Sequence, residues 1–378
     1  MIQYLLAVLL LLVPLLGECM PAQKPTNYSI EAGEFVNLPA KDNKVNKMGF
    51  METLSILKKV FLEKSTRAPQ AKLPEIKPDM NEFLKPSDFV KFIWFGHSTL
   101  LLNLDGRILL IDPVFGKSAS PFDFLVTRFQ PPVLKLEELP NIDAILISHD
   151  HYDHLDKTTV KYFAEKNVEF IVPLGVGDHL LEWGVKPIRI VELNWGESIS
   201  QVGIKFTATP ARHFSGRGLF DRNKTLWASW VIQGKHDKLF YSGDSGYGDH
   251  FKEIGKRYGP FDIAFMENGQ YNERWPDVHM QPEESLQAMV DVDAKALVPV
   301  HWGMFDLSLH HWSEPIKRTY QIAKAWDIPI FTPKFGEVVD TGKPTYVNTP
   351  WWEPIPTATT TQAQDQKLGM KLVPELAK

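Results

Sequence analysis

The chain has 378 residues, of which 44% are hydrophobic and 23% charged, so it is long enough to bury a large core in one main domain. Its formal net charge is -5 and no basic patch that could follow a phosphate backbone is visible, which argues against nucleic acid as a partner. Because the chain has one cysteine, an internal disulfide is excluded.

The start of the chain predicts export. An apolar run from Tyr4 to Leu16 has the length of a signal-peptide core and is shorter than the roughly 20 residues that span a membrane. Cys19 follows in a context that resembles a bacterial lipoprotein signal. We therefore expect residues 1–19 to be a signal peptide or lipoprotein signal. The protein would then be periplasmic or membrane-associated, with Cys19 as the site of a lipid anchor; an uncleaved membrane anchor is the alternative.

Residues 20–85 are predicted to form an N-terminal extension of mixed polar and apolar composition. Apolar side chains recur at helical spacing from Met48 to Phe61 with lysines off that stripe, which predicts a basic amphipathic helix. We expect this helix to pack on the domain, and peripheral contact with an anionic membrane is the alternative.

The main domain is expected to span residues 86–345. His97 follows an aromatic strand and Asp112 ends an apolar run, so both are predicted to orient metal-bound groups through hydrogen bonds. A packed core imidazole is the alternative for His97, and a turn or helix cap is the alternative for Asp112. The apolar connection Ser120–Pro132 would either wall a groove for acyl chains or form an ordinary core insertion.

The most specific feature is the motif His-x-His-x-Asp-His, which runs from His149 to His154 directly after a buried strand. A zinc ion takes four ligands and a catalytic zinc keeps one position open, so four adjacent protein ligands on one ion would leave no room for chemistry. The motif therefore predicts two ions, with a hydrogen-bonded polar loop as the alternative.

Further ligands are expected where other strands end. His213, Asp244 and His301 each follow a short apolar run. Asp244 is assigned as the bridge, because it is the remaining carboxylate once the other ligands are divided. The predicted first zinc site consists of His149, His151 and His213, and the second consists of Asp153, His154 and His301.

The end of the chain, residues 346–378, is predicted to be a largely disordered tail. It is rich in Thr and Gln from Thr357 to Gln366 and shows no periodicity.

With this order of ligands the chain resembles the metallo-β-lactamase fold superfamily. Within it, the chain is similar to N-acylphosphatidylethanolamine-hydrolysing phospholipase D and its bacterial relatives over residues 86–340. The phrases that carry the likeness include Phe95-Gly-His-Ser-Thr, Ile111-Asp-Pro-Val-Phe, Gly243-Asp-Ser-Gly-Tyr and His301-Trp-Gly-Met-Phe. The resemblance implies an α/β fold, a four-layer α/β/β/α sandwich with all ligands along one edge.

The resemblance also implies a dinuclear zinc-dependent hydrolase acting on a phospholipid or other phosphodiester, with manganese or iron as alternative metals and hydroxide as the nucleophile. Asp153 is then catalytic through its metal. His279, in a loop before a helix expected near Pro282, would hold the substrate phosphate or protonate the leaving group, with a surface role as the alternative. Glu267 and Asn268 depart from the apolar residues of the phospholipases. A lactonase or other ester hydrolase, or a non-catalytic envelope binding protein, are the alternative functions.

Overall fold

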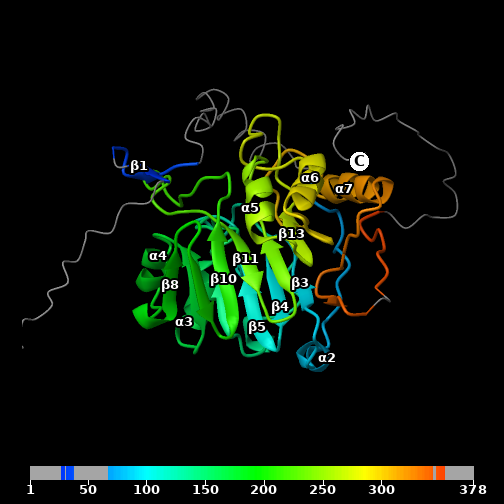
Figure 1. The fold of residues 1–378 in the computed structure, drawn as a ribbon, viewed down its shortest axis with the longest axis horizontal. Coiled ribbons are helices and arrows are strands. Elements are labelled where there is room, and N and C mark those ends of the chain that lie inside the picture. Colours follow the sequence, from blue (N-terminus) through cyan, green and yellow to red (C-terminus); the bar gives the residue numbers. More distant parts are fainter. Residues whose placement is uncertain (1–26, 30, 38–66, 344–345, 354–378) are drawn as a thin grey trace, which may run out of the picture.

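The structure is a computed structural model that describes residues 27–29, 31–37, 67–343 and 346–353. Two β-sheets face each other at the centre, and helices cover the outer face of each sheet (Figure 1). The predicted four-layer α/β/β/α sandwich is confirmed.

The first sheet combines an antiparallel part with a parallel part. Strands β3, β4 and β5 are antiparallel, whereas β5, β6, β7 and β8 run parallel to one another. Every residue of β3 and β4 is buried, and both strands are mostly apolar because both of their faces are covered. The strand order is β15 (Val338–Asp340), β3 (Lys91–Trp94), β4 (Leu100–Leu104), β5 (Arg107–Ile111), β6 (Ala144–Leu146), β7 (Glu169–Pro173) and β8 (Ile190–Leu193).

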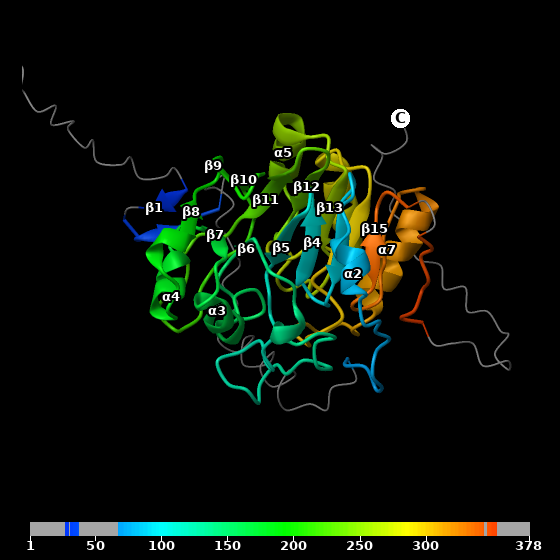
Figure 2. The ribbon, with the colours of Figure 1, turned by 90° about the horizontal axis from the view of Figure 1, so that it is seen from below.

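The second sheet is built in the same way, with a parallel part formed by β12, β13 and β14. Figure 2 shows β9 to β13 in one row and β4 to β8 in the other. The order is β14 (Leu297–Val300), β13 (Ile263–Glu267), β12 (Lys238–Tyr241), β11 (Ser229–Gln233), β10 (Ile204–Thr209) and β9 (Ser198–Gln201). A separate small ribbon joins β1 (Tyr28–Ser29) and β2 (Glu34–Phe35).

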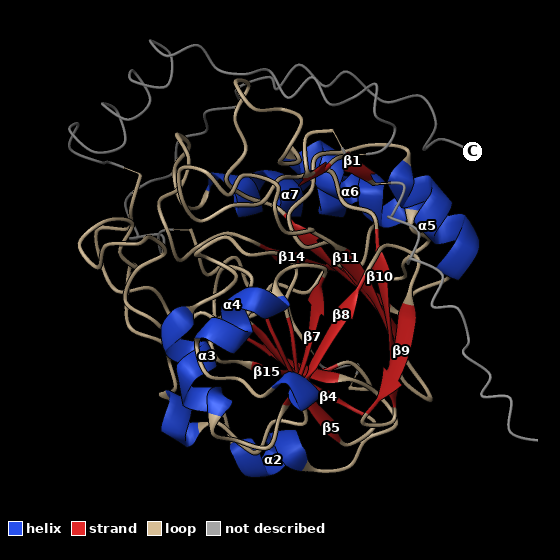
Figure 3. Ribbon diagram, turned by 90° about the vertical axis from the view of Figure 1, so that its left-hand side faces the viewer, coloured by secondary structure: helices blue, strands red, loops and turns tan. Residues whose placement is uncertain are grey.

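Each helix layer lies on one sheet. Figure 3 shows α5, α6 and α7 on one side of the strands and α2, α3 and α4 on the other. One apolar cluster fills the space between the sheets, and a separate cluster lies under each helix layer. The helices are α2 (Met80–Leu84), α3 (Lys157–Ala164), α4 (Gly177–Glu182), α5 (His250–Tyr258), α6 (Pro282–Asp291) and α7 (Glu314–Ala325).

The strand directions gather polar side chains at one edge of the sandwich. Parallel strands end at the same edge, and here the residues that follow β5, β6, β12 and β14 include Asp112, His149, Asp244 and His301. The two sheets are joined at this edge, because the His97 N–H donates to Trp302 O at 2.9 Å and the His301 N–H donates to His97 O at 2.8 Å.

Segments outside residues 86–345 also pack on the domain. The Ile76 N–H donates to Phe335 O at 2.8 Å, and Trp351 stacks on Trp302 with ring centroids 5.4 Å apart. The tail predicted from residue 346 thus begins with a packed segment. The predicted signal segment, the helix predicted between Met48 and Phe61 and the end of the tail lie outside the described residues. Within the described ranges, no helix is long and apolar enough to cross a membrane.

Candidate metal centre

The motif loop follows β6 and is fixed at both ends. The Ser148 N–H donates to Asp112 Oδ1 at 2.7 Å, and the Leu155 N–H closes a turn onto His151 O at 2.8 Å. Arg217 Nη1 donates to Asp150 O at 2.6 Å and to Leu155 O at 2.8 Å, so one guanidinium ties together the two sides of the loop. This loop geometry turns the motif side chains toward one point.

Three residues at this edge have backbone angles that non-glycine residues rarely adopt. The φ angles are 51° for His97, 39° for Asp112 and 66° for His301. Such left-handed conformations cost free energy and cluster at functional sites, where the surrounding contacts hold them in place. The surrounding contacts therefore hold these three residues in strained conformations in which their side chains face inward.

The first predicted set of ligands is assembled. His151 Nδ1 lies 2.8 Å from His149 Nε2 and 3.3 Å from His213 Nε2. Asp244 Oδ2 lies 3.8 Å from His149 Nε2 and 3.7 Å from His213 Nε2. These four residues each offer one ligand atom within 4.8 Å of the others.

The second predicted set is also assembled, and His97 joins it. His154 Nε2 lies 3.4 Å from Asp153 Oδ2, and His97 Nε2 lies 2.8 Å from the same oxygen. His97, Asp153, His154 and His301 form a second group whose ligand atoms lie within 4.8 Å of one another. His97 is buried and touches a predicted ligand directly, in keeping with the orienting role proposed for it.

Asp244 faces both groups. Its Oδ2 lies 3.2 Å from His154 Nε2 and its Oδ1 lies 3.1 Å from His301 Nδ1, in addition to its contacts with the first group. This is the position that a bridging carboxylate would need.

The residues present fit two divalent ions. Atoms bound to one tetrahedral zinc at about 2.1 Å lie roughly 3.4 Å apart, which is close to the spacings in both groups. His154 Nε2 and Asp244 Oδ1 are buried and make ion-pair contacts at 3.1–3.4 Å, but neither makes a hydrogen bond of ordinary geometry among the described residues. Buried polar atoms are normally hydrogen-bonded, so both atoms are compatible with metal ligation.

The electrostatics favour a neutral imidazole, the form that binds metals, at His149, His151 and His213 but not at His154. Burial, reinforced by neighbouring imidazoles, lowers the pKa of His149 and His213 well below the ordinary value, and burial lowers the pKa of His151 to about 4. Burial raises the pKa of Asp244 to about 6. Burial alone would lower the pKa of His154, but the carboxylates of Asp244, Asp153 and Asp112 raise it well above its ordinary value.

The family model of the beta-lactamase superfamily domain matches residues 107–302, which contain every predicted ligand. The chain belongs to the metallo-β-lactamase superfamily. An uncharacterized protein of Mycobacterium tuberculosis is 42% identical over 326 residues, covering 85% of this chain and 86% of the relative. N-acyl-phosphatidylethanolamine-hydrolyzing phospholipase D 1 of Caenorhabditis elegans is 36% identical over 246 residues, covering 61% of this chain and 69% of the relative.

A solved structure of a possible metal-dependent hydrolase from Veillonella parvula matches with a TM-score of 0.55 at 17% identity, covering 67% of this chain and 99% of that chain. At this level of identity the match shows the fold. The resemblance to the superfamily and to its phospholipase D members, predicted from the motifs, is confirmed. The chain is thus a member of a superfamily of metal-dependent hydrolases.

The carboxylate of Asp112 makes several hydrogen bonds next to the second group of ligands. It accepts from the Ser148 N–H and, at 2.5 Å, from the Ser148 hydroxyl; it also accepts from the Tyr241 hydroxyl. His154 Nδ1 lies 2.7 Å from Asp112 Oδ2. An ionised Asp112 keeps the proton of His154 on Nδ1, which leaves Nε2 free for a metal.

Three groups that support the ligands were not predicted from the sequence. His213 Nδ1 lies 3.0 Å from the carbonyl oxygen of Val278, and Ser98 Oγ lies 3.1 Å from His301 Nδ1. Asn37, in the N-terminal extension, accepts from the His213 N–H at 3.1 Å and donates to His213 O at 2.9 Å. The position of Ser98 directly after His97 was a usable signal, whereas nothing in the sequence marks Asn37.

His279 lies at the centre rather than on the surface. Its ring centroid is 5.2 Å from those of His213 and His301, and its side chain is 13% exposed. Glu267, at the end of β13, is fully buried, and its Oε2 lies 3.0 Å from His279 Nδ1. Burial raises the pKa of Glu267 well above its ordinary value and lowers the pKa of His279. The departure from the phospholipase pattern at Glu267 therefore falls inside the site.

Proposed function

We propose that the chain is a dinuclear zinc-dependent phosphodiesterase of the N-acylphosphatidylethanolamine phospholipase D type, which cleaves a phospholipid headgroup. The observation that carries this proposal is the pair of ligand groups that share Asp244 at one edge of the sandwich. The likeness to the phospholipase of Caenorhabditis elegans supports phosphorus as the reacting centre.

The proposed ligand sets use every residue of the first two groups except His97. When bound, two divalent ions lower the pKa of a water molecule between them toward neutrality and stabilise the oxygens of a displacement at phosphorus. No serine or cysteine nucleophile is then needed. His149, His151 and His213 would hold one ion, and Asp153, His154 and His301 the other, with Asp244 shared.

The chain's own residues set the orientation and the protonation of this centre. Asp112 keeps the proton of His154 on Nδ1, and His97 restrains the Asp153 carboxylate at 2.8 Å. His279 would hold the substrate phosphate or give a proton to the leaving oxygen. If it gives the proton, His279→Asn will slow cleavage of an alkyl phosphodiester more than cleavage of a nitrophenyl phosphodiester, because nitrophenolate leaves without a proton.

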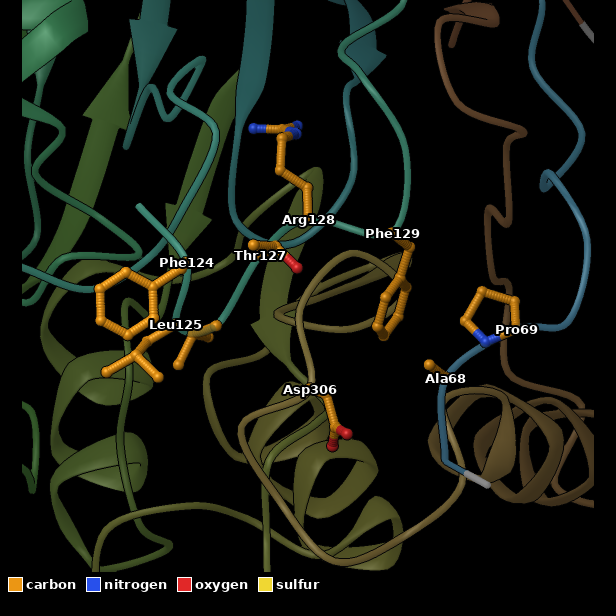
Figure 4. Close-up of a pocket in the computed structure, with 9 residues that line it drawn as sticks. Ala68, Pro69, Phe124, Leu125, Thr127, Arg128, Phe129 and Asp306 are labelled. Atoms are coloured by element: carbon orange, nitrogen blue, oxygen red, sulfur yellow. The ribbon is translucent and has the colours of Figure 1, made fainter. Parts of the chain in front are cut away.

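The surface beside the Ser120–Pro132 connection offers a place for lipid contact. Phe122 and Phe124 are 55% and 76% exposed, and their rings stack with centroids 5.7 Å apart. Next to them lies a cavity of about 430 Å³. Figure 4 shows Phe124 and Leu125 on one side of it, with Phe129, Ala68 and Pro69 on the other. We propose that the exposed phenylalanines contact the lipid surface of an exported, peripherally bound enzyme.

A lactonase or other ester hydrolase with the same two metals is the second candidate. The buried carboxylate of Glu267 favours it, because in its ionised form this group, 3.0 Å from His279, repels an anionic phosphate but not a neutral lactone. The two candidates therefore differ in the charge of their substrate.

One panel of substrates tests both candidates. The purified chain, loaded with zinc, is assayed on bis(p-nitrophenyl) phosphate, on a set of lactones and on nitrocefin, and then on total membrane lipid with analysis of the products. Turnover of the phosphodiester and release of a headgroup support the proposal. Turnover of lactones alone overturns it in favour of the second candidate. Less than one zinc per chain without any turnover would instead support a non-catalytic envelope binding protein.

A further inference from the structure

We propose that Glu267 is the positioning residue of His279 and holds the imidazole with its proton on Nδ1, leaving Nε2 as the nitrogen available to substrate. This inference rests on the proposed function, since it concerns the same site. It assigns a role to a buried carboxylate that lies outside both ligand groups.

The contacts of Glu267 are those of an orienting group. Its Oε2 accepts from the Ser245 N–H at 3.1 Å, and its Oε1 accepts from the Met280 N–H at 2.5 Å. A backbone N–H can only donate, so both contacts stabilise the ionised carboxylate and oppose the effect of burial, which raises the pKa of Glu267. Beside the ionised carboxylate, His279 Nδ1 at 3.0 Å is the donor, whereas a protonated Glu267 would donate to it and invert the tautomer.

The same carboxylate is poorly placed to be a metal ligand. Glu267 does form a third group with Asp244, His279 and His301, in which the ligand atoms lie within 4.8 Å of one another. However, both of its oxygens already accept hydrogen bonds from groups fixed by the backbone. Binding an ion would have to compete with these contacts, whereas orienting His279 uses them.

A fixed tautomer has a chemical consequence. With the proton on Nδ1, the lone pair of His279 is on Nε2, where it can accept a proton from water or substrate and later return it to a leaving oxygen. The rings of His213 and His301, each 5.2 Å away, flank the imidazole and limit its rotation. Glu267 thus relates to His279 as Asp112 relates to His154.

The substitution Glu267→Gln tests this arrangement. A glutamine has one acceptor oxygen. If that oxygen faces Met280 N–H, the amide NH2 faces Ser245 N–H and His279 Nδ1, and His279 must then accept and carry its proton on Nε2. If the oxygen faces Ser245 and His279, the NH2 opposes the Met280 N–H. The first arrangement inverts the tautomer of His279, and the second weakens the hydrogen bond that holds the side chain at position 267 to Met280.

The direct readout is nitrogen-15 NMR of the full chain loaded with zinc and labelled at histidine. The His279 signals are identified by their loss in His279→Asn, a matched variant whose amide can still donate to Glu267 but which has no Nε2. We expect a protonated Nδ1 and an unprotonated Nε2 in the wild type. A wild-type His279 protonated on Nε2 alone overturns the inference, whether or not Glu267→Gln folds.

The second readout is kinetic. We expect Glu267→Gln to lower kcat on an alkyl phosphodiester about 10- to 100-fold and kcat on bis(p-nitrophenyl) phosphate by less, with KM within about twofold and two zinc ions retained. Because Glu267 acts through His279, adding Glu267→Gln to His279→Asn should cause no further loss. Full additivity of the two losses, or loss of one zinc per chain in Glu267→Gln, overturns the positioning role. A wild type with no phosphodiesterase activity refutes the proposed function, while the NMR result still decides the tautomer.

Discussion

Replacing Asp112 with asparagine should weaken one metal site without disturbing the backbone. The φ angle of Asp112 is 39°, a conformation that asparagine tolerates better than alanine does. Asparagine can keep its oxygen on the Ser148 N–H, which donates to Asp112 Oδ1 at 2.7 Å. Its NH2 group then faces the hydroxyls of Ser148 and Tyr241 and the Nδ1 of His154.

The expected magnitude follows from what each neighbour can accept. Hydroxyl groups can turn and accept, but His154 can accept only if its proton moves to Nε2, the nitrogen that should bind the metal. The opposite amide orientation would leave the buried Ser148 N–H facing another donor, which costs about 1–3 kcal/mol. Loss of an orienting partner of this kind costs about 10- to 100-fold in metal affinity, or about 1.4–2.7 kcal/mol.

In the assay, zinc is titrated into the metal-free wild type and into metal-free Asp112→Asn, and binding is measured by calorimetry. We expect one of two binding steps to weaken by the stated factor. Tyr241→Phe is the matched control, because it removes one donor to the same carboxylate and leaves the His154 tautomer unchanged; its affinity should fall by less than about fivefold. Two wild-type affinities in Asp112→Asn would refute the role given to Asp112.

Three further predictions follow from the centre and its surroundings. Asp153→Asn and His301→Asn should each lower hydrolysis by at least about 1,000-fold while circular dichroism stays that of the wild type, and near-normal activity in either variant would contradict the dinuclear site. Removal of metal with a chelator should abolish turnover and added zinc or manganese should restore it; turnover that persists in excess chelator would count against any metal-dependent step. Burial, with the charge of Arg212, lowers the pKa of His250 to about 3, so the unfolded chain takes up a proton first as the pH falls. The stabilising contribution of neutral His250 is therefore complete above about pH 6.5 and declines below it, by about 1.4 kcal/mol per pH unit down to the folded pKa. Urea unfolding of metal-free protein at pH 7 and pH 5 should show a smaller loss in His250→Gln than in wild type, and equal losses would refute the assignment.

The residues of the two candidate ligand groups could be predicted from the sequence, because they follow the ends of short apolar runs. Each of His149, His213, Asp244 and His301 comes after a short apolar run, and parallel strands bring their carboxyl ends to one edge. The helix expected near Pro282 begins at that residue. Strand ends are local features of the sequence, so together with the order of the candidate ligands they were sufficient to predict both groups.

The groups that orient the ligands could not be predicted in the same way. Glu267 meets His279 across a loop, and Arg217 reaches back to Asp150 and Leu155, so these contacts exist only once distant segments have packed. A lone charged residue after a strand has many roles, and nothing in the sequence distinguishes an orienting carboxylate from a ligand. Side-chain partners are decided by tertiary geometry, which the periodicity of a chain does not encode.

The contact between Asn37 and His213 bears on how this enzyme can be cut down for study. The matched family region, residues 107–302, contains all seven proposed ligands. It does not contain Asn37, whose side-chain amide makes hydrogen bonds to both the N–H and the carbonyl oxygen of His213. A fragment trimmed to that region would also lose His97 and strands β3 and β4, so the chain has to be shortened from its start only. Asn37 also accepts from the Trp227 indole N–H at 3.1 Å. Shortened chains that begin after residue 37 should therefore bind their first zinc poorly, even where the fold is intact.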